Sequence, residues 1–215
     1  GLPGLQHVDH VGLTVPELDA AVRFYCDVIG GVELYRIGPF DAAEMPRMPD
    51  GRDWTDAHIN VAGARLTIAM LQLGPNIMLE LFQYDRPAER GRTPPRNCDF
   101  GGHHIALKVS DLAAAKDHLA RHGCRVMAGP IVLDEGPCAG LKVNYVLDPW
   151  GNQLELVQYE RVTPDVLAVE PRREPRDGLS AAELTVGLGV VGRTTSAGIS
   201  STMVRSSSVS SPLMA

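Results

Sequence analysis

The chain has 215 residues and a net charge of -6, from 20 basic and 26 acidic side chains. Its composition, 44% hydrophobic and 21% charged, is that of an ordinary globular protein. The acidic balance, without a Lys/Arg cluster, argues against nucleic acid or an anionic membrane as a partner. The sequence has no transmembrane-length apolar run, no signal-peptide pattern and no disulfide-rich cysteine spacing, so we expect a cytoplasmic protein.

An internal repeat occupies the first 160 residues. The run DHVGLTVPELDAA at 9–21 matches HHIALKVSDLAAA at 103–115, with an offset of 94 residues. The run LELFQY at 79–84 matches LELVQY at 154–159, with an offset of 75 residues. The two units therefore share a beginning and an end, and the first is longer by 19 residues. We interpret this pattern as the duplication of one structural unit.

The first unit opens with apolar residues at every second position from 11 to 15, which predicts a strand. Pro16 and the helical spacing after it predict a helix that stops at Gly30-Gly31. Proline, glycine and charged residues predict that the additional residues form a loop over 37–54. Three more strands are predicted, at 57–61, 65–71 and 77–84.

The second unit follows the same order. Alternation over 105–109 predicts its first strand, and Ser110 is the predicted cap of a helix that ends at Gly123. Its remaining strands are predicted at 126–128, 141–147 and 153–159. Each unit thus reads strand-helix-strand-strand-strand.

The composition changes sharply near residue 161. The last aromatic residue is Tyr159, and the stretch that follows is rich in Pro, Arg and Ser. Such a stretch buries too little apolar area to offset its ordering entropy. We therefore predict modules at 5–85 and 99–160, a linker at 86–98 and a low-complexity, disordered tail at 161–215.

The period of two in the strands separates their side chains onto two faces. In each closing strand two leucines face the helices, so the glutamate between them, Glu80 or Glu155, points to the opposite face. On the opening strands His10 and His104 turn the same way. If the two units pair, two imidazoles and two carboxylates converge in one cleft. Since a carboxylate in such a cleft is costly unless it is paired or metal-bound, these four residues are the predicted metal ligands.

Two imidazoles and two carboxylates suit one divalent ion such as Zn²⁺, Ni²⁺, Co²⁺, Mn²⁺ or Fe²⁺. A substrate with two neighbouring oxygens could complete the coordination, and the ion would stabilise its enolate. A glutamate ligand that loosens on substrate binding would carry the proton, so Glu80 and Glu155 are the catalytic candidates.

Four side chains are candidates for substrate binding. Thr14 and Lys108 share the face of the predicted ligands, and Tyr145 lies on a neighbouring strand. We interpret the 37–54 loop as a lid whose Arg47 or Arg52 meets a carboxylate or phosphate. A solvated excursion or a dimer contact are the alternatives for this loop.

The repeated unit, its openings at 9–25 and 103–115 and its closing runs MLELFQY and DPWGNQLELVQY resemble the vicinal oxygen chelate superfamily. That superfamily includes glyoxalase I, methylmalonyl-CoA epimerase, extradiol dioxygenases and the bleomycin- and fosfomycin-resistance proteins. The resemblance covers residues 5–160 and implies an α+β fold of two paired βαβββ modules that form a curled mixed sheet around a metal cleft. By position, His10, Glu80, His104 and Glu155 match the ligand places of glyoxalase I. The epimerases usually have Gln at the place of Glu80.

The resemblance implies a divalent-metal-dependent lyase or isomerase that acts through a metal-stabilised enolate on a small substrate with vicinal oxygens. Two alternatives stay open: an Fe(II) dioxygenase of the extradiol type, and a non-catalytic drug-binding resistance protein. The sequence also leaves open whether the modules pair within one chain or between two chains of a homodimer.

Overall fold

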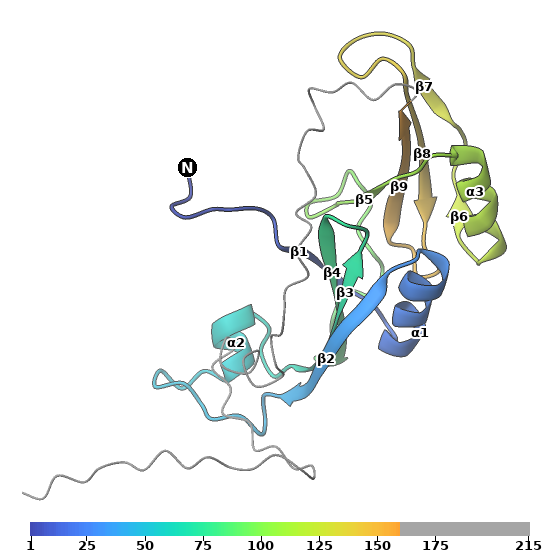
Figure 1. Ribbon diagram of the computed structural model, residues 1–215. Helices are drawn as coiled ribbons and strands as arrows, with labels where there is room; N and C mark the ends of the chain where they lie inside the picture. The colour runs from blue at the N-terminus through green and yellow to red at the C-terminus, as the bar shows by residue number, and fades with distance from the viewer. Residues whose placement is uncertain (160–215) are drawn as a thin grey trace, which may run out of the picture. The chain divides into compact units, whose positions relative to one another are not determined.

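The computed structural model describes residues 1–159. Its first module begins with β1 (His10–Thr14) and α1 (Leu18–Arg23), which continues as a π-helical segment (Phe24–Val28). It goes on through β2 (Val32–Asp41), α2 (Trp54–Ile59), β3 (Arg65–Leu73) and β4 (Ile77–Arg86). The sheet order is β1-β4-β3-β2, in which β1 runs parallel to β4 and the other neighbours are antiparallel (Figure 1).

The second module repeats this plan. It contains β5 (Ile105–Lys108), α3 (Leu112–Arg121), β6 (Arg125–Val126), β7 (Ile131–Leu133), β8 (Leu141–Leu147) and β9 (Gln153–Tyr159). The sheet order is β5-β9-β8-β6, with β7 also paired to β8, and β5 runs parallel to β9. The predicted α+β fold of two βαβββ modules is therefore confirmed, as two separate mixed sheets.

The repeated glutamine of the closing strands fixes the start of each helix. The Leu18 backbone N–H donates to Gln83 Oε1 at 2.7 Å, and the Leu112 N–H donates to Gln158 Oε1 at 2.7 Å. Each bond satisfies one of the backbone donors that a helix N-terminus leaves unpaired. The closing strand of each module is thus hydrogen-bonded to the start of the helix in the same module.

The helix cap predicted at Ser110 was wrong by one residue. Asp111 is the N-cap of α3, and its side chain accepts a bond from the Ala114 N–H at 2.9 Å. Aspartate and serine are both favoured caps, and only the backbone conformation decides between neighbours.

The principal hydrophobic core joins both modules. Leu79, Leu81, Leu154 and Leu156 of the closing strands are at most 1% exposed and pack in one cluster with residues of α1 and α3. The fully buried Tyr25 hydroxyl donates to Asp148 Oδ2 at 2.9 Å across the modules. Burial, and then the nearby Asp148 charge, raise the pKa of Tyr25, so this phenol stays protonated as a donor.

Three sequence predictions for the first module were wrong. Residues 57–61 are not a strand, because α2 begins after the Asp53 N-cap and ends at Asn60, whose φ of 57° is left-handed. The loop predicted at 37–54 is shorter than expected and covers 42–53, since β2 runs to Asp41 and α2 starts at Trp54. Strand β2 was not predicted. It is an edge strand with mostly exposed side chains, so it lacks the apolar alternation that marks a half-buried strand.

The second module follows its predictions more closely. Strands β8 and β9 have the predicted bounds, while β6 is shorter than predicted and β7 was missed. All three residues of β7 are apolar and exposed, so the strand shows no alternation. The predicted tail at 161–215 lies outside the described residues. Among the described helices, none is long and apolar enough to cross a membrane.

Replacing Tyr25 by Phe removes the hydroxyl and keeps the ring. We expect the free energy of unfolding to fall by about 1.5–3 kcal/mol, the usual worth of a hydrogen bond to a charged group. Urea unfolding curves measure the loss. The control is Tyr159→Phe, at a ring that is 38% exposed. Equal stability of Tyr25→Phe and the wild type would contradict a structural role for this bond.

Candidate functional site

Each sheet presents one histidine beside one glutamate on the face that turns away from the core. His10 Nε2 lies 3.2 Å from Glu80 Oε2, and His104 Nε2 lies 3.1 Å from Glu155 Oε2. The neighbouring leucines of each glutamate point into the core, so the predicted alternation is confirmed. We call His10 with Glu80 the first half-site and His104 with Glu155 the second half-site.

In both half-sites the imidazole is more exposed to solvent than the carboxylate. The histidine side chains are 38% and 36% exposed, and those of Glu80 and Glu155 are 19% and 14% exposed. Burial raises the pKa of Glu80, an effect that the neighbouring His10 opposes. Each half-site thus has a partly desolvated carboxylate with one accessible nitrogen donor next to it.

The donor atoms of each half-site suit a divalent metal ion. Ligand atoms about 2.1 Å from one ion lie about 3.0–3.4 Å apart at tetrahedral or octahedral angles. The two nitrogen–oxygen separations, 3.2 and 3.1 Å, fall within this span. The same separations also suit a hydrogen bond, so the geometry fits both the free pair and joint ligation.

The two half-sites do not meet within the described part of one chain. Over residues 1–159, no group of three or more His, Cys, Asp or Glu side chains lies close enough to hold an ion together. The sequence left open whether the four side chains meet within one chain or between two, and within residues 1–159 of one chain they do not form such a group. Each module offers two donors of the predicted four.

The first half-site has an additional carboxylate that the sequence analysis missed. Asp9 Oδ2 lies 3.0 Å from His10 Nδ1. Because an ionised carboxylate only accepts hydrogen bonds, Nδ1 carries the proton and Nε2 is left to face Glu80. The second module has His103 at this place of the repeat, and its Nδ1 lies 3.1 Å from the Gly101 carbonyl oxygen. The difference between Asp9 and His103 at equivalent places of the repeat could have identified Asp9 from the sequence.

The second half-site includes Tyr145. This residue lies directly opposite Glu155 on the neighbouring strand, and its ring meets the His104 ring edge-on at 5.5 Å. Burial, and then the Glu155 charge, raise the pKa of Tyr145. In the first module Met70 lies opposite Glu80. Burial, and then the Glu80 charge, raise the pKa of Tyr35 and of Tyr84, so phenols lie near both glutamates.

The other substrate candidates have contacts of their own. Thr14 is exposed and pairs in register with Phe82, on the face of β1 that carries His10. The Lys108 ammonium lies 5.5 Å from the centre of the Tyr159 ring. Arg52 pairs with Asp50 inside the insertion at 2.8 Å, and Arg47 donates to the Gly51 carbonyl oxygen at 2.9 Å.

The insertion is anchored to the first sheet through Asp53. Its carboxylate accepts from the Thr55 hydroxyl and from the backbone N–H groups of Asp56 and Gly63, at 2.7–2.9 Å. These bonds lower the pKa of Asp53 from 3.8 to about 2. The stabilisation is therefore present above pH 3.8 and is lost as the pH falls through about 2. These bonds hold the C-terminal end of the insertion against the Gly63 backbone, and its role as a lid stays a prediction.

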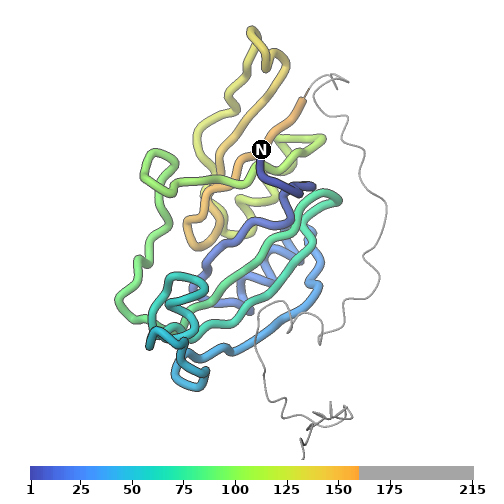
Figure 2. Tube along the Cα trace, turned by 90° about the vertical axis from the view of Figure 1, so that its left-hand side faces the viewer, coloured from blue at the N-terminus to red at the C-terminus, as the bar shows by residue number. Residues whose placement is uncertain are grey.

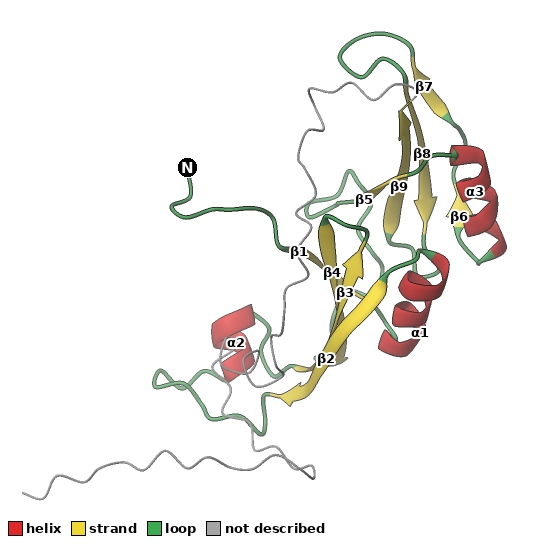
Figure 3. Cartoon of the chain, viewed as in Figure 1, coloured by secondary structure: helices red, strands yellow, loops and turns green. Residues whose placement is uncertain are grey.

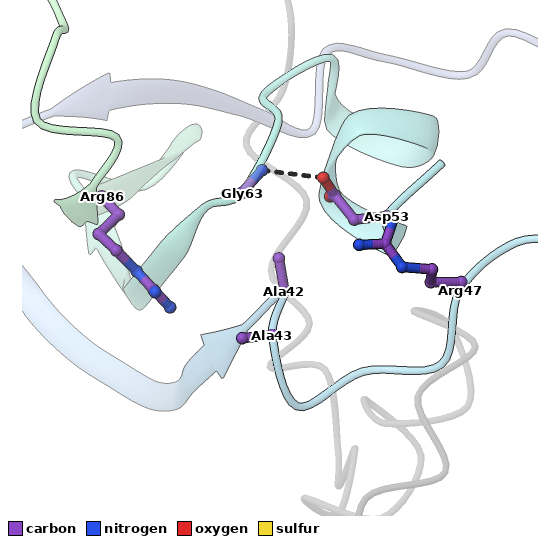
Figure 4. Close-up of a pocket in the computed structure, with 6 residues that line it drawn as sticks. All are labelled: Ala42, Ala43, Arg47, Asp53, Gly63 and Arg86. Atoms are coloured by element: carbon purple, nitrogen blue, oxygen red, sulfur yellow. Dashed lines mark hydrogen bonds between the residues drawn. The ribbon is translucent and has the colours of Figure 1, made fainter. Parts of the chain in front are cut away.

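A small open pocket of about 180 Å³ lies between the insertion and the end of β4 (Figure 4). Its lining consists of Ala42, Ala43, Arg47, Asp53, Gly63 and Arg86. Arg86 is six residues beyond Glu80 along β4, which is about 20 Å in a strand. This pocket is therefore remote from the first half-site, and both of its arginines already have oxygen partners.

A second apolar cluster covers the face of the first sheet that carries Glu80. Figure 3 shows α1 and α2 on opposite sides of this sheet, and Figure 2 shows the insertion at one of its ends. The cluster is made of Ala64, Leu66 and Ile68, with Ile37, Phe40, Ile59, Val61, Phe82 and Tyr84 packed against them. Ile37 and Phe40 of β2 and Ile59 of α2 thus pack on the same face of the sheet as Glu80.

Comparison with known proteins identifies the family. The model of the Glyoxalase/Bleomycin resistance protein/Dioxygenase superfamily matches residues 7–156. The chain is 42% identical over 180 residues to a 2-epi-5-epi-valiolone epimerase from Actinomyces sp., covering 83% of this chain and 93% of the relative. It is also 28% identical over 159 residues to the uncharacterized protein YaeR of Escherichia coli K12, covering 72% of this chain and 98% of that protein.

Solved structures show the same fold. A glyoxalase family protein from Bacillus cereus aligns with a TM-score of 0.58 and 19% identity, over 74% of this chain and 97% of that one. The chain therefore belongs to the glyoxalase/bleomycin resistance/dioxygenase superfamily. Its similarity to an epimerase supports an enzyme with an isomerase-like role.

Replacing Asp53 by Ala removes the cap and the bond to Gly63. We expect faster hydrogen exchange over residues 42–64 and a stability loss of about 1 kcal/mol, typical of a lost N-cap. Hydrogen-exchange mass spectrometry measures the first effect. Asp50→Ala is the control, because Asp50 bonds within its own turn. Equal exchange in the two variants would contradict the anchoring role of Asp53.

Proposed function

We propose that the protein is a divalent-metal-dependent isomerase that epimerises a small substrate at a carbon next to a carbonyl group. The observation that supports this function is the His–Glu pair repeated at equivalent places of the two modules, with its imidazole open to solvent. Exposed carboxylates are enough for solubility, so solubility does not explain a half-buried carboxylate beside a histidine in both modules. The relative named as an epimerase favours this reaction among those of the superfamily.

His10, Glu80, His104 and Glu155 would hold the ion. When bound there, a divalent ion would supply positive charge for the substrate carbonyl oxygen and lower the pKa of the adjacent C–H group. The imidazoles keep Nε2 as the donor atom, which Asp9 favours at His10 through Nδ1. The substrate would bind such an ion through two neighbouring oxygens.

The two glutamates would move the proton. One carboxylate accepts the proton from the carbon beside the carbonyl, and the electron pair passes into the carbonyl group as an enolate. The other carboxylic acid returns a proton to the opposite face of that carbon, which inverts its configuration. Burial raises the pKa of Glu80, which suits this carboxyl group to the task.

The named substrate of the relative is the first compound to test. We propose that 2-epi-5-epi-valiolone, or a small ketone of similar chemistry, is epimerised by this chain. Glyoxalase-type lyase activity is the second reaction to assay.

We further propose that the complete site is shared between two copies of the chain. The described residues of one chain hold two half-sites but no cluster of three donors. A two-fold dimer would bring the first half-site of each protomer to the second half-site of its partner and would form two equal sites. The homodimer is thus part of the proposed mechanism.

Metal removal and ligand substitution test the reaction. Protein purified without chelator should contain stoichiometric divalent metal and should lose its activity after chelation. We expect Glu155→Gln to lower kcat by roughly 10²–10⁴-fold, the usual range for loss of a general acid–base group. We expect His10→Ala to weaken metal binding, measured by elemental analysis after dialysis.

His58→Ala is the matched control for metal content, because His58 packs on Trp54 in α2. Full metal occupancy in His10→Ala would contradict the ligand set. Iron with oxygen uptake would instead indicate a dioxygenase, and tight ligand binding without metal would indicate a binding protein.

Mixing two inactive variants tests the shared site. Glu80→Gln and Glu155→Gln chains, unfolded and refolded together, should form mixed dimers with one intact site. Random pairing then restores about one quarter of the wild-type activity, since half of the dimers are mixed and one of their two sites is intact. Sites built within single chains would restore no activity, which would contradict the sharing.

A further inference from the structure

The ring of Phe82 lies beside the first half-site. Phe82 and Glu80 are two residues apart on β4 and share one face of the sheet. On β1, Gly12 is directly opposite Glu80 and two residues after His10. A Cβ atom built on Gly12 would lie 3.2 Å from Phe82 Cε2. The Phe82 ring therefore reaches over Gly12, between the strands that carry His10 and Glu80.

The protein holds this ring in place from its other side. Phe82 stacks on Tyr84, with ring centres 6.0 Å apart and planes inclined by 19°. Both rings pack against the buried residues Leu66 and Ile68, in the second apolar cluster. Phe82 is only half-buried, so part of its surface is left beside the half-site.

The second module lacks this arrangement. At the equivalent places of the repeat it has Ala106 for Gly12 and Val157 for Phe82. Ala106 lies opposite Glu155 and Val157 lies opposite Lys108, the same register as in the first module. The first module thus combines no side chain with a large ring, and the second combines a methyl group with a smaller aliphatic side chain. A methyl group at residue 12 would lie 3.2 Å from the Phe82 ring, so the ring would have to shift to make room for it.

We propose that Phe82 is the specificity-determining surface of the site and receives the C–H face of a saturated ring in the substrate. The negative face of an aromatic ring attracts C–H hydrogens, and the contact excludes water on one side of the reacting carbon. Since the ring lies two residues from Glu80, a substrate seated on it has its carbon next to a carboxylate. This inference rests on the proposed function for the reaction and on the contacts of Phe82 for the binding.

Three variants separate substrate binding from packing: Phe82→Val, Gly12→Ala and the double variant, which copies the second module. Phe40→Val is the matched control, since Phe40 belongs to the same cluster but lies on the edge strand β2. Unfolding curves measure stability. Ligand titrations followed by NMR measure the affinity of the full chain for the probe 2-hydroxycyclohexanone, a saturated ring with vicinal oxygens.

We expect Phe82→Val to weaken probe binding about five- to tenfold, as loss of an aromatic contact does. Gly12→Ala should lower both stability and probe affinity, because the new methyl group displaces the ring. The double variant should regain stability and not affinity. Phe40→Val should bind the probe like the wild type.

Unchanged probe affinity in Phe82→Val would overturn the inference, as would equal loss in Phe40→Val or absence of binding to the wild type. None of these readouts depends on turnover. Inactivity of the wild type toward ketones would count against the proposed function alone.

Discussion

The period of two in the closing strands is the constraint on which the site depends. Leu79 and Leu81 must enter the core that α1 and α3 cover, so Glu80 has to stand on the other face. The second module obeys the same rule at Glu155. A shift of one residue in either register would place a carboxylate in the core and two leucines in water. Fold stability and site geometry are therefore determined by the same register.

The duplication supplies two similar half-sites, and later differences make them unequal. Asp9 supports the histidine of the first half-site, while Tyr145 borders the second. Phe82 gives the first module an aromatic surface where the second has Val157. In the proposed epimerisation such inequality would suit two carboxyl groups of which one takes a proton while the other returns one.

The sequence predicted what depends on local periodicity. It predicted β8 and β9 with their bounds, and the facing of Glu80 and Glu155, because each strand has one buried face. It failed at β2, whose exposed side chains show no alternation, and at α2, which is too short for a helical stripe. The meeting of the half-sites could not be predicted, because periodicity determines the face of a side chain and not the placement of one module against another.

In the proposed mechanism the two His–Glu pairs are halves of one metal site shared between protomers. A crystal structure of the Co²⁺-loaded protein, with anomalous data at the cobalt edge, locates the ion. We expect one cobalt peak per chain, ligated by His10 and Glu80 of one protomer and by His104 and Glu155 of its partner. A cobalt ion bound elsewhere, or held by one half-site without the other, would contradict it.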